Sequence, residues 1–320
     1  YKSRLLRALD YRENPFELAP DPDHTGNGKR SVKHYDTAPP IGGKIKSFSD
    51  SIERDSSIHL SCGDSAESGL PDGSVDLVVT DPPFFDNVHY SELADFFYAW
   101  QQQLFGEDAE EDGSTTTRRK GEVQDVEPTA FADKLEDVFS DCYRVLNDSG
   151  DLVFSYHHSR EEGWSSVARA VSEAGFTFVA SQPVKSEMSN AIPKSQANSP
   201  IDIDVLLVCR KHVNDERDLK PREEAFEWAV SATQEKITIL NAAGYMLSGG
   251  DVRVLLGSHL LVALSGGRSS TEFMDGLSDQ LEQAWQTAEA MAKRQKKAEQ
   301  TVGEQVEPYA PLFDGLIGSE

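Results

Sequence analysis

The sequence predicts an α/β protein, with a mostly parallel sheet that has helices on both faces and a helical region after it. Three observations predict this class. Short apolar runs recur between residues 57 and 210, helix-like stretches separate them, and beyond residue 215 only helical patterns remain. Continuous apolar runs are typical of strands buried on both faces, as in parallel sheets. Strands that alternate with helices indicate a doubly wound arrangement.

Four parts follow one another along the chain. The lead-in, residues 1–55, is polar and rich in Pro, Gly and Asp, and is expected to be irregular; "NPFELAPDPDHTGNGKRS" is typical of a loop. The sheet domain covers residues 56–213, the helical C-terminal region covers 214–297, and a flexible tail covers 298–320. Neighbouring strands of one sheet are expected at 58–62, 75–80, 151–156, 176–182 and 203–209.

Two helices are expected inside the sheet domain. "PTAFADKLEDVFSDCYRVLND" has apolar residues at helical spacing, and Gly150 follows it as a stop signal. "GWSSVARAVSEAG" is a second helix, ended by Gly175. The acidic insert at 106–128 is expected to be a mobile loop. In the C-terminal region, Ser269 and Glu272 form a candidate capping box before the last helix.

The chain is strongly acidic, with a formal net charge of -24. An acidic surface repels nucleic acid. It is also the kind of surface that stays soluble at high salt, where screening is strong. The acids are spread along the chain rather than gathered in one tail, which agrees with halophilic adaptation. Charge alone therefore does not exclude a DNA partner.

Composition excludes several other classes of protein. The three cysteines are far apart, which argues against a disulfide framework and a zinc ribbon and indicates a reducing cytoplasm. No apolar run is long enough to span a bilayer, and no secretory signal peptide is visible. The chain begins with Tyr1 rather than Met, as expected of a fragment or a trimmed product.

The stretch "VVTDPPFF" carries the chemistry. An apolar strand ends at Asp81, and ligands of parallel α/β sheets lie outside the carboxyl ends of strands. Pro82 and Pro83 fix the backbone that follows and lack N–H groups, so Phe84 is held beside the carboxylate. A carboxylate next to a rigid aromatic ring suits a flat heterocycle that bears an amino group. Asp64 ends the preceding predicted strand, so both carboxylates are expected at one edge of the sheet.

Asp-Pro-Pro-Phe is similar to the catalytic motif of the amino-methyltransferases, which methylate the exocyclic amine of adenine or cytosine in DNA. The neighbouring "SIHLSCGDSAESGLPDGSVDLVVTDPPF" and "YRVLNDSGDLVFSYHH" resemble the same family. "DNVHYSELADFFYAW" resembles its branch of large bacterial and archaeal adenine-specific methylases, some of which are associated with defence against phage. The resemblance covers roughly residues 57–260 and implies a partial Rossmann-like methyltransferase sheet, in a chain that looks like the C-terminal part.

The resemblance implies a role for individual residues and a cofactor, S-adenosyl-L-methionine. Asp81 would accept the hydrogens of the target amine, Pro82 and Pro83 would shape the loop, and Phe84 would stack on the base. Asp64 and Asp81 would lie at the cofactor. The resemblance implies no metal, and a base in a duplex would have to be flipped out.

Several of these residues have a second interpretation. Asp64 could be an ordinary cap of the helix that follows it. Asn87 and Tyr90 could line the substrate pocket, or Asn87 could cap a helix while Tyr90 packs. His157 and His158 are adjacent and point to opposite faces of a strand, so they do not share a metal and at most one faces the pocket.

A complete enzyme of this family also has a Gly-rich loop that holds the cofactor, and no such loop precedes the motif. Either it lies upstream of this chain, or the order is permuted and the loop is at Gly266 and Gly267. The expected partners are DNA and an upstream half or defence-system subunits, without a membrane. The alternative function is a non-catalytic DNA-binding or defence-complex module. A third interpretation, transfer to another planar amide or amine, is disfavoured by Asp at position 81.

Overall fold

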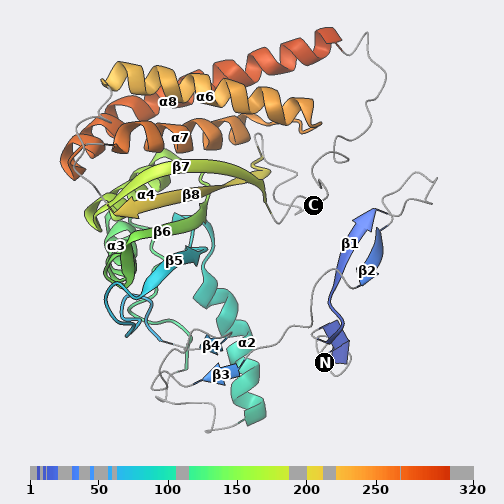
Figure 1. Cartoon of the computed structure of the whole chain (residues 1–320), viewed down its shortest axis with the longest axis vertical. Helices are drawn as coiled ribbons and strands as arrows, with labels where there is room; N and C mark the ends of the chain where they lie inside the picture. Colours follow the sequence, from blue (N-terminus) through green and yellow to red (C-terminus); the bar gives the residue numbers. More distant parts are fainter. Residues whose placement is uncertain are drawn as a thin grey trace. The chain divides into compact units, whose positions relative to one another are not determined.

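The structure, a computed structural model, describes residues 6–7, 10–11, 13–20, 31–35, 44–46, 57–59, 63–105, 115–186, 200–211, 221–266 and 268–302 (Figure 1). The chain divides into two compact units, Tyr1–Gly63 and Asp64–Glu320.

The first unit contains two pairs of short strands. They are β1 (Phe16–Pro20) antiparallel to β2 (Ser31–Tyr35), and β3 (Lys44–Lys46) parallel to β4 (Ser57–His59). The prediction of an irregular lead-in over residues 1–55 is therefore wrong for β1, β2 and β3, whereas β4 lies beyond it. The Lys33 amine of β2 lies 3.8 Å from the centre of the Phe16 ring in β1. Such a cross-strand contact stabilises a pair that local turn signals do not reveal.

The second unit is built on a four-stranded sheet in the order β5-β6-β8-β7. Its strands are β5 (Val75–Thr80), β6 (Leu146–Tyr156), β7 (Phe176–Lys185) and β8 (Ile203–Lys211). β5 and β6 are parallel, whereas β8 is antiparallel to both β6 and β7. Three strands therefore run in one direction and β8 in the other, and the predicted α/β class with a mostly parallel sheet is confirmed.

The strand predicted at 58–62 does not belong to this sheet. Residues 57–59 form β4, which pairs with β3, and residues 60–62 lie outside the described part of the chain. A short apolar run specifies extended backbone but not which strand it pairs with, which is why the sequence misassigned it. The other four predicted strands all lie in the sheet.

The helices of the second unit surround this sheet unevenly. They are α2 (Tyr90–Phe105), α3 (Pro128–Val145), α4 (Glu161–Glu173), α6 (Arg222–Ala242), α7 (Gly249–Ser265) and α8 (Ser270–Val302), with the 3-10 helix η1 (Phe85–Asn87). α3 and α4 lie against the sheet, and α6, α7 and α8 are stacked beyond β7 (Figure 1). Gly175, which ends α4 as predicted, has a φ of 90° that suits glycine.

Within the described residues, helices cover one face of the sheet, and the other, the open face, is only partly buried. Phe154 and Tyr156 of β6 are fully buried against aromatic side chains of α3 and α4. On the opposite face, the alternate residues of β6 and β8 are half-buried, and Leu77 and Val79 of β5 are exposed. Helices were expected on both faces, but in the described residues the cover lies on the face of Phe154. Along β6 and β8, buried residues alternate with half-buried ones. The sequence did not reveal this, because the half-buried positions are also largely apolar.

α7 is buried on nearly every side because it lies among β7, β8, α6 and α8. This burial explains its uniformly apolar sequence. The permuted order needed a strand before Gly266, and it is excluded because α7 is a helix that ends there. Ser269 and Glu272 form the predicted capping box: the Ser269 N–H donates to Glu272 at 3.0 Å. α8 continues to Val302, so the predicted tail begins later than residue 298, and its remainder lies outside the described residues.

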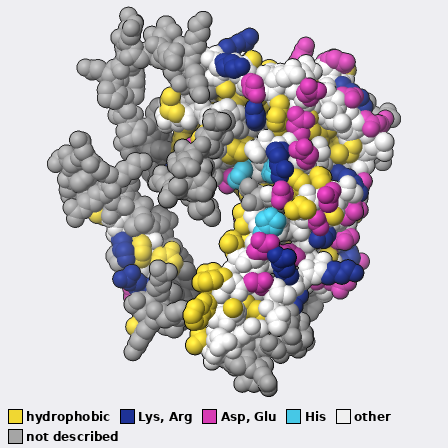
Figure 2. Space-filling model, turned by 180° about the vertical axis from the view of Figure 1, so that it is seen from behind, with side chains coloured by type: hydrophobic (Ala, Val, Ile, Leu, Met, Phe, Trp, Pro, Cys, Tyr) yellow, Lys and Arg dark blue, Asp and Glu magenta, His cyan; other side chains and the backbone are white. Residues whose placement is uncertain are grey.

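α2 carries large apolar side chains on its surface. Six of them are more than half exposed: Tyr90, Leu93, Phe96, Phe97, Trp100 and Leu104. Hydrophobic side chains are visible along the lower part of the molecule in Figure 2. Within the described residues, no helix combines the length and the apolarity that crossing a bilayer requires.

Candidate functional site

Asp81 lies at the carboxyl end of β5, where the sequence predicted it. It follows Thr80, the last residue of the strand, and its side chain is exposed. Thr80 is paired with Phe154 of β6, so the next residue of β6, Ser155, comes close to Asp81. The Ser155 hydroxyl donates a hydrogen bond to Asp81 Oδ1. The carboxylate is therefore held from one side and open to solvent on the other.

Phe84 is held by two rings at the end of β6. Its ring centre lies 5.3 Å from that of Tyr156 and 4.8 Å from that of His157, with both pairs close to perpendicular. Pro82 is buried, and Pro83 and Phe84 are half-buried. The two prolines and the two ring contacts give the half-buried Phe84 ring a fixed place after the carboxylate, as the sequence predicted.

Phe85 has a strained backbone, with a φ of 34° that non-glycine residues rarely adopt. Its side chain is 2% exposed and contacts the rings of Phe131 and His158. Packing therefore explains Phe85. The residue after it, Asp86, forms an ion pair with Arg160 at 3.1 Å.

The loop after β5 contacts the end of β6 and the loop that follows β6, in the same order along both segments. The contacts are Asp81 with Ser155, Phe84 with Tyr156 and His157, Phe85 with His158, and Asp86 with Arg160. From the sequence, the first segment was expected to carry the chemistry, and in the second only the histidines were candidates. The two loops contact each other because β5 and β6 are parallel neighbours that end at the same edge.

His157 is hydrogen-bonded to Asp204 of β8, with 2.5 Å between Nδ1 and Oδ1. Both side chains are mostly buried, at 22% and 16% exposure. Burial instead lowers the pKa of His158, which lies on the covered side and accepts a hydrogen bond from the Arg160 N–H at 3.1 Å. The two adjacent histidines therefore point to different sides, and only His157 lies against Phe84.

Tyr90 lies close enough to Asp81 for their charges to interact. Burial raises the pKa of the Tyr90 phenol, and the negative charge of Asp81 raises it further. The side chain is 52% exposed, so it is available at the surface beside the carboxylate. The backbone of Asn87 lies in η1, but its side chain lies outside the described part of the structure. Substrate contact by Asn87 and Tyr90 stays a prediction.

Asp64 does not end a strand of the sheet that carries Asp81. It follows no strand of the four-stranded sheet, and its Oδ1 accepts a hydrogen bond from the Ala66 N–H at 2.9 Å. Asp64 thus caps a turn, and not the helix that the alternative interpretation expected after it. A cavity of about 290 Å³ opens beside Asp64 and is also lined by Lys120, Lys134 and Asp137. Asp81 does not line this cavity. The expectation that Asp64 and Asp81 lie at one sheet edge assumed that each ends a strand of the sheet, and for Asp64 this assumption is wrong.

The cavity beside Asp64 does not fit S-adenosylmethionine well. Its carboxylates and lysines could pair with polar groups, but its apolar lining consists of Ala66 and Val138, without an aromatic ring to cover adenine. In the described residues, no strand of the sheet leads into a Gly-rich loop. These residues also contain no group of three or more potential metal ligands. The described site thus fits the target-base side of a transfer reaction and not the cofactor side.

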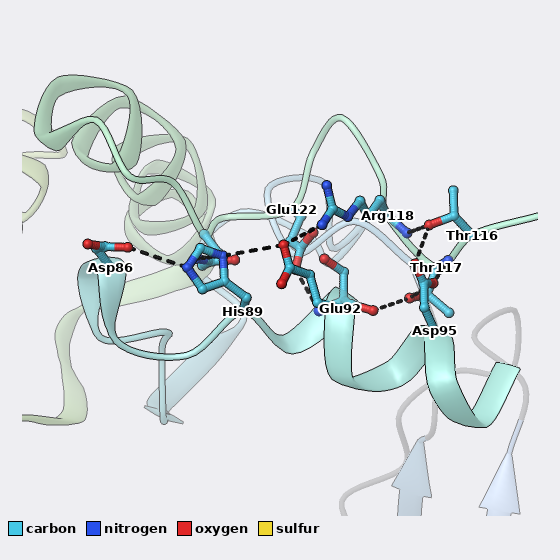
Figure 3. A network of polar contacts seen from close by, with 10 residues as sticks. Asp86, His89, Glu92, Asp95, Thr116, Thr117, Arg118 and Glu122 are labelled. Atoms are coloured by element: carbon cyan, nitrogen blue, oxygen red, sulfur yellow. Dashed lines mark hydrogen bonds and ion pairs between the residues drawn. The ribbon is translucent and has the colours of Figure 1, made fainter. Parts of the chain in front are cut away.

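The start of α2 is fixed by a polar network with residues 116–124 (Figure 3). Asp95 accepts hydrogen bonds from the hydroxyls of Thr116 and Thr117, each at 2.7 Å, and Arg118 forms an ion pair with Glu92. These hydrogen bonds, led by that of the Thr117 N–H, lower the pKa of Asp95. Residues 115–127 are therefore ordered against α2, and the expected mobile loop applies at most to 106–114, which lie outside the described residues.

Comparison with known proteins gives a family match. The family model described as DNA methylase matches residues 75–305, which is more than half of the chain. Similar solved structures include those of TTHA0409 from Thermus thermophilus, which carries the name DNA modification methylase. The selenomethionine form is 19% identical with a TM-score of 0.28, and the match covers 52% of this chain and 61% of that one.

The same Thermus protein in complex with S-adenosyl-L-methionine is also 19% identical, with a TM-score of 0.27 and 61% of its length covered. This chain therefore spans about three fifths of the solved proteins that it resembles. No curated protein matches it.

Proposed function

The chain belongs to the DNA methylase family, and from that premise we propose that it transfers a methyl group from S-adenosyl-L-methionine, the cofactor of this family, to the exocyclic amine of adenine in DNA. The observation that carries the proposal is the carboxylate of Asp81, held by Ser155 at the carboxyl end of β5 beside the fixed ring of Phe84. This arrangement suits a flat base with an amino group.

The residues of the chain would act on the amine of the base. Its lone pair is delocalised into the ring, which makes it a poor nucleophile. Asp81 accepts one hydrogen of the amine and the carbonyl of Pro82 accepts the other, which draws the nitrogen towards a tetrahedral shape. Phe84 stacks on the flipped base and fixes its plane, so that the lone pair points in one direction. The resemblance of Asp-Pro-Pro-Phe to the adenine-directed form supports adenine over cytosine.

The cofactor would be held largely by a polypeptide outside the described residues, as an upstream half or a partner subunit. Two observations support this part of the proposal. The cavity beside Asp64 lacks a cover for adenine. Among the described residues β5 pairs with β6 alone and is an edge strand, and it exposes Leu77 at 53% and Val79 at 69%. An exposed apolar edge strand is a place where a further strand can add to a sheet.

The charge of the surface is compatible with DNA at high salt. Lys and Arg side chains lie among the Asp and Glu side chains on the face seen in Figure 2. We propose halophilic adaptation in the cytoplasm, because acids spread over a surface keep a protein soluble where salt screens their repulsion. Screening also weakens the repulsion between an acidic protein and DNA.

The second candidate function is a non-catalytic DNA-binding or defence-complex module. The observation that favours it is the lack of a fitting cofactor cavity in the described residues. It differs from the first in that Asp81 would have no reaction to support, so its replacement would leave the activity of the complex unchanged.

Methyl transfer from labelled cofactor to DNA in molar KCl tests the proposal. The chain should be assayed alone and expressed together with the coding sequence upstream of it. Alone it should methylate nothing, and the complete protein should form N6-methyladenine, identified by mass spectrometry of the nucleosides.

Asp81→Ala should abolish transfer by the complete protein while cofactor binding persists, because Asp81 contacts the amine and not the groups that hold the cofactor. Asp148→Ala, an exposed carboxylate at the other end of β6, is the matched control. Robust methylation by the isolated chain, or full activity of Asp81→Ala, would contradict the assignment.

A further inference from the structure

The pair of His157 and Asp204 lies on the open face of the sheet. Ser155 and His157 are two residues apart at the end of β6, so they project to the same side. Tyr156 is paired with Val205 of β8, which places Asp204 opposite His157. A polar row therefore crosses this face of the sheet from Asp81 through Ser155 and His157 to Asp204.

Residues 155–157 lie at the end of β6 and directly after it, and each supports a part of the Asp-Pro-Pro-Phe motif. Ser155 donates to the carboxylate of Asp81, and the imidazole of His157 meets the ring of Phe84 at an interplanar angle of 74°. Tyr156 supplies the other wall of Phe84, and it is fully buried with its hydroxyl bonded to the Gly163 carbonyl at 2.7 Å. Tyr156 is thus fixed by the core, whereas the wall made by His157 is fixed by a charged partner.

Asp204 is well placed to fix the orientation of the imidazole. It lies on β8, the strand between β6 and β7, and it is paired with Val184 of β7. At 2.5 Å from Nδ1, its carboxylate restricts rotation of the ring about the Cα–Cβ and Cβ–Cγ bonds. A rigid strand, a carboxylate, an imidazole and then Phe84 form a continuous chain of contacts.

We propose that His157, oriented by Asp204, is a positioning residue that sets the plane of Phe84 and thereby the plane of the target base. This inference rests on the proposed function, in which Phe84 stacks on the flipped base. His157 contributes a ring wall and not a proton or a bond to the substrate. Without that wall, the half-buried Phe84 ring is held on one side only, by Tyr156, and gains freedom that base binding must then remove.

Binding of a fluorescent base tests the inference without cofactor. The probe is a short thymine-rich single strand of DNA that carries one 2-aminopurine, whose emission changes when the base leaves its neighbours and stacks on a protein ring. Phe84→Ala should weaken binding most. His157→Ala should weaken it about threefold to tenfold, in line with the loss of one aromatic pair. His157→Phe, which keeps a ring wall, should bind like the wild type, and Asp204→Asn should have an intermediate effect.

Tyr143→Ala is the matched control, because Tyr143 makes a T-shaped contact of similar geometry with Phe176, at 5.3 Å and 73°, at the start of β7. It should bind the probe like the wild type. Circular dichroism and urea unfolding of every variant identify any that fail to fold, and His157→Phe and Asp204→Asn carry the test if His157→Ala is among them.

A double variant separates positioning from independent packing. If His157 acts through Phe84, His157→Ala combined with Phe84→Ala should bind no more weakly than Phe84→Ala alone. Additive losses, a His157→Ala variant as good as the control, or rescue by His157→Gln as complete as by His157→Phe would overturn the inference and leave the proposed function standing. An undiminished Phe84→Ala would overturn the role of Phe84 and the inference with it.

Discussion

His259 shows how burial of a single residue makes stability depend on pH. It lies in α7, is 5% exposed, and its Nδ1 is 2.9 Å from the hydroxyl of Thr233. That hydroxyl already donates to the Ala229 carbonyl, so Nδ1 carries the hydrogen that it donates to Thr233. Burial lowers the pKa of His259 to about 4, and the charge of Lys236 contributes in the same direction.

We expect the free energy of unfolding to fall as the pH drops below the ordinary pKa of histidine. In the folded chain the ring stays neutral down to pH about 4, whereas in the unfolded chain it takes up a proton near pH 6.5. The stability is therefore complete above about pH 6.5 and is lost as the pH falls towards 4, by roughly 2 kcal/mol at pH ~5. Urea unfolding above about pH 6.5 and at pH ~5 measures this loss of stability.

His259→Asn is the control for this prediction, because its amide nitrogen can donate to Thr233 but does not titrate. Its loss of stability between the same pH values should be smaller than that of the wild type by about the predicted 2 kcal/mol. Equal losses in both proteins would show that His259 is not the group that titrates.

At the same scale, the candidate site was only partly predictable. Asp81, Pro82 and Phe84 were found because a strand that ends on a carboxylate and prolines is a local signal. Ser155 and Asp204 were missed because their roles depend on which strands are neighbours, and the sequence does not specify that β8 lies beside β6. Asp64 was misplaced for a related reason: the short strand before it pairs outside the sheet.

Asp251 connects two elements, the start of α7 and the start of β8. Its side chain is fully buried and accepts hydrogen bonds from the Ser248 N–H at 2.8 Å, the Asp202 N–H at 2.6 Å and the Ile203 N–H at 3.1 Å. Burial raises its pKa, and these hydrogen bonds oppose that shift. One carboxylate thus completes a helix cap and anchors a strand.

Asp251→Ala should destabilise the second unit by about 3 to 5 kcal/mol, because it leaves three buried N–H groups without an acceptor. Asp251→Asn should cost less, since the amide oxygen can still accept. Asp275→Ala, an exposed carboxylate on α8, is the control and should change stability little. Urea unfolding followed by circular dichroism measures all three, and a loss for Asp251→Ala no larger than the control's would refute the anchoring role.

At the scale of elements, the sequence predicted most of the helices, and four of the five strands that it predicted lie in the four-stranded sheet. Periodicity is a local property, so α3 and α4 could be recognised from spacing alone, and the region of α6, α7 and α8 was recognised as helical. β1, β2 and β3 of the first unit were not predicted, and β4, which overlaps the strand predicted at 58–62, was assigned to the wrong sheet. Each of these strands has three to five residues, and their paired residues lie 11 to 19 positions apart.

For the whole molecule, the net charge of -24 predicts that salt stabilises the fold. Like charges repel more strongly in the compact chain than in the unfolded one, and salt shortens the range of that repulsion to about 3 Å at 1 M. The midpoint of thermal unfolding should therefore rise with KCl concentration. A midpoint that stays constant across the titration would contradict the halophilic interpretation.

Glu227→Lys together with Glu235→Lys provides a matched test of the same prediction. Both residues are exposed on the outside of α6, and the double change makes the net charge less negative by four units without altering a buried contact. The midpoint of this variant should rise less steeply with KCl than that of the wild type, because there is less repulsion to screen.

The exposed apolar row of α2 gives this acidic molecule an unusual colloidal character. In dilute salt, the negative charge keeps copies apart over distances of about 30 Å at 0.01 M, and the row has little opportunity to matter. In molar salt, that long-range barrier shrinks to the thickness of one water layer, while the attraction between apolar surfaces persists. The osmotic second virial coefficient should then be set by sixteen residues, Tyr90–Phe105, rather than by the charge of all 320.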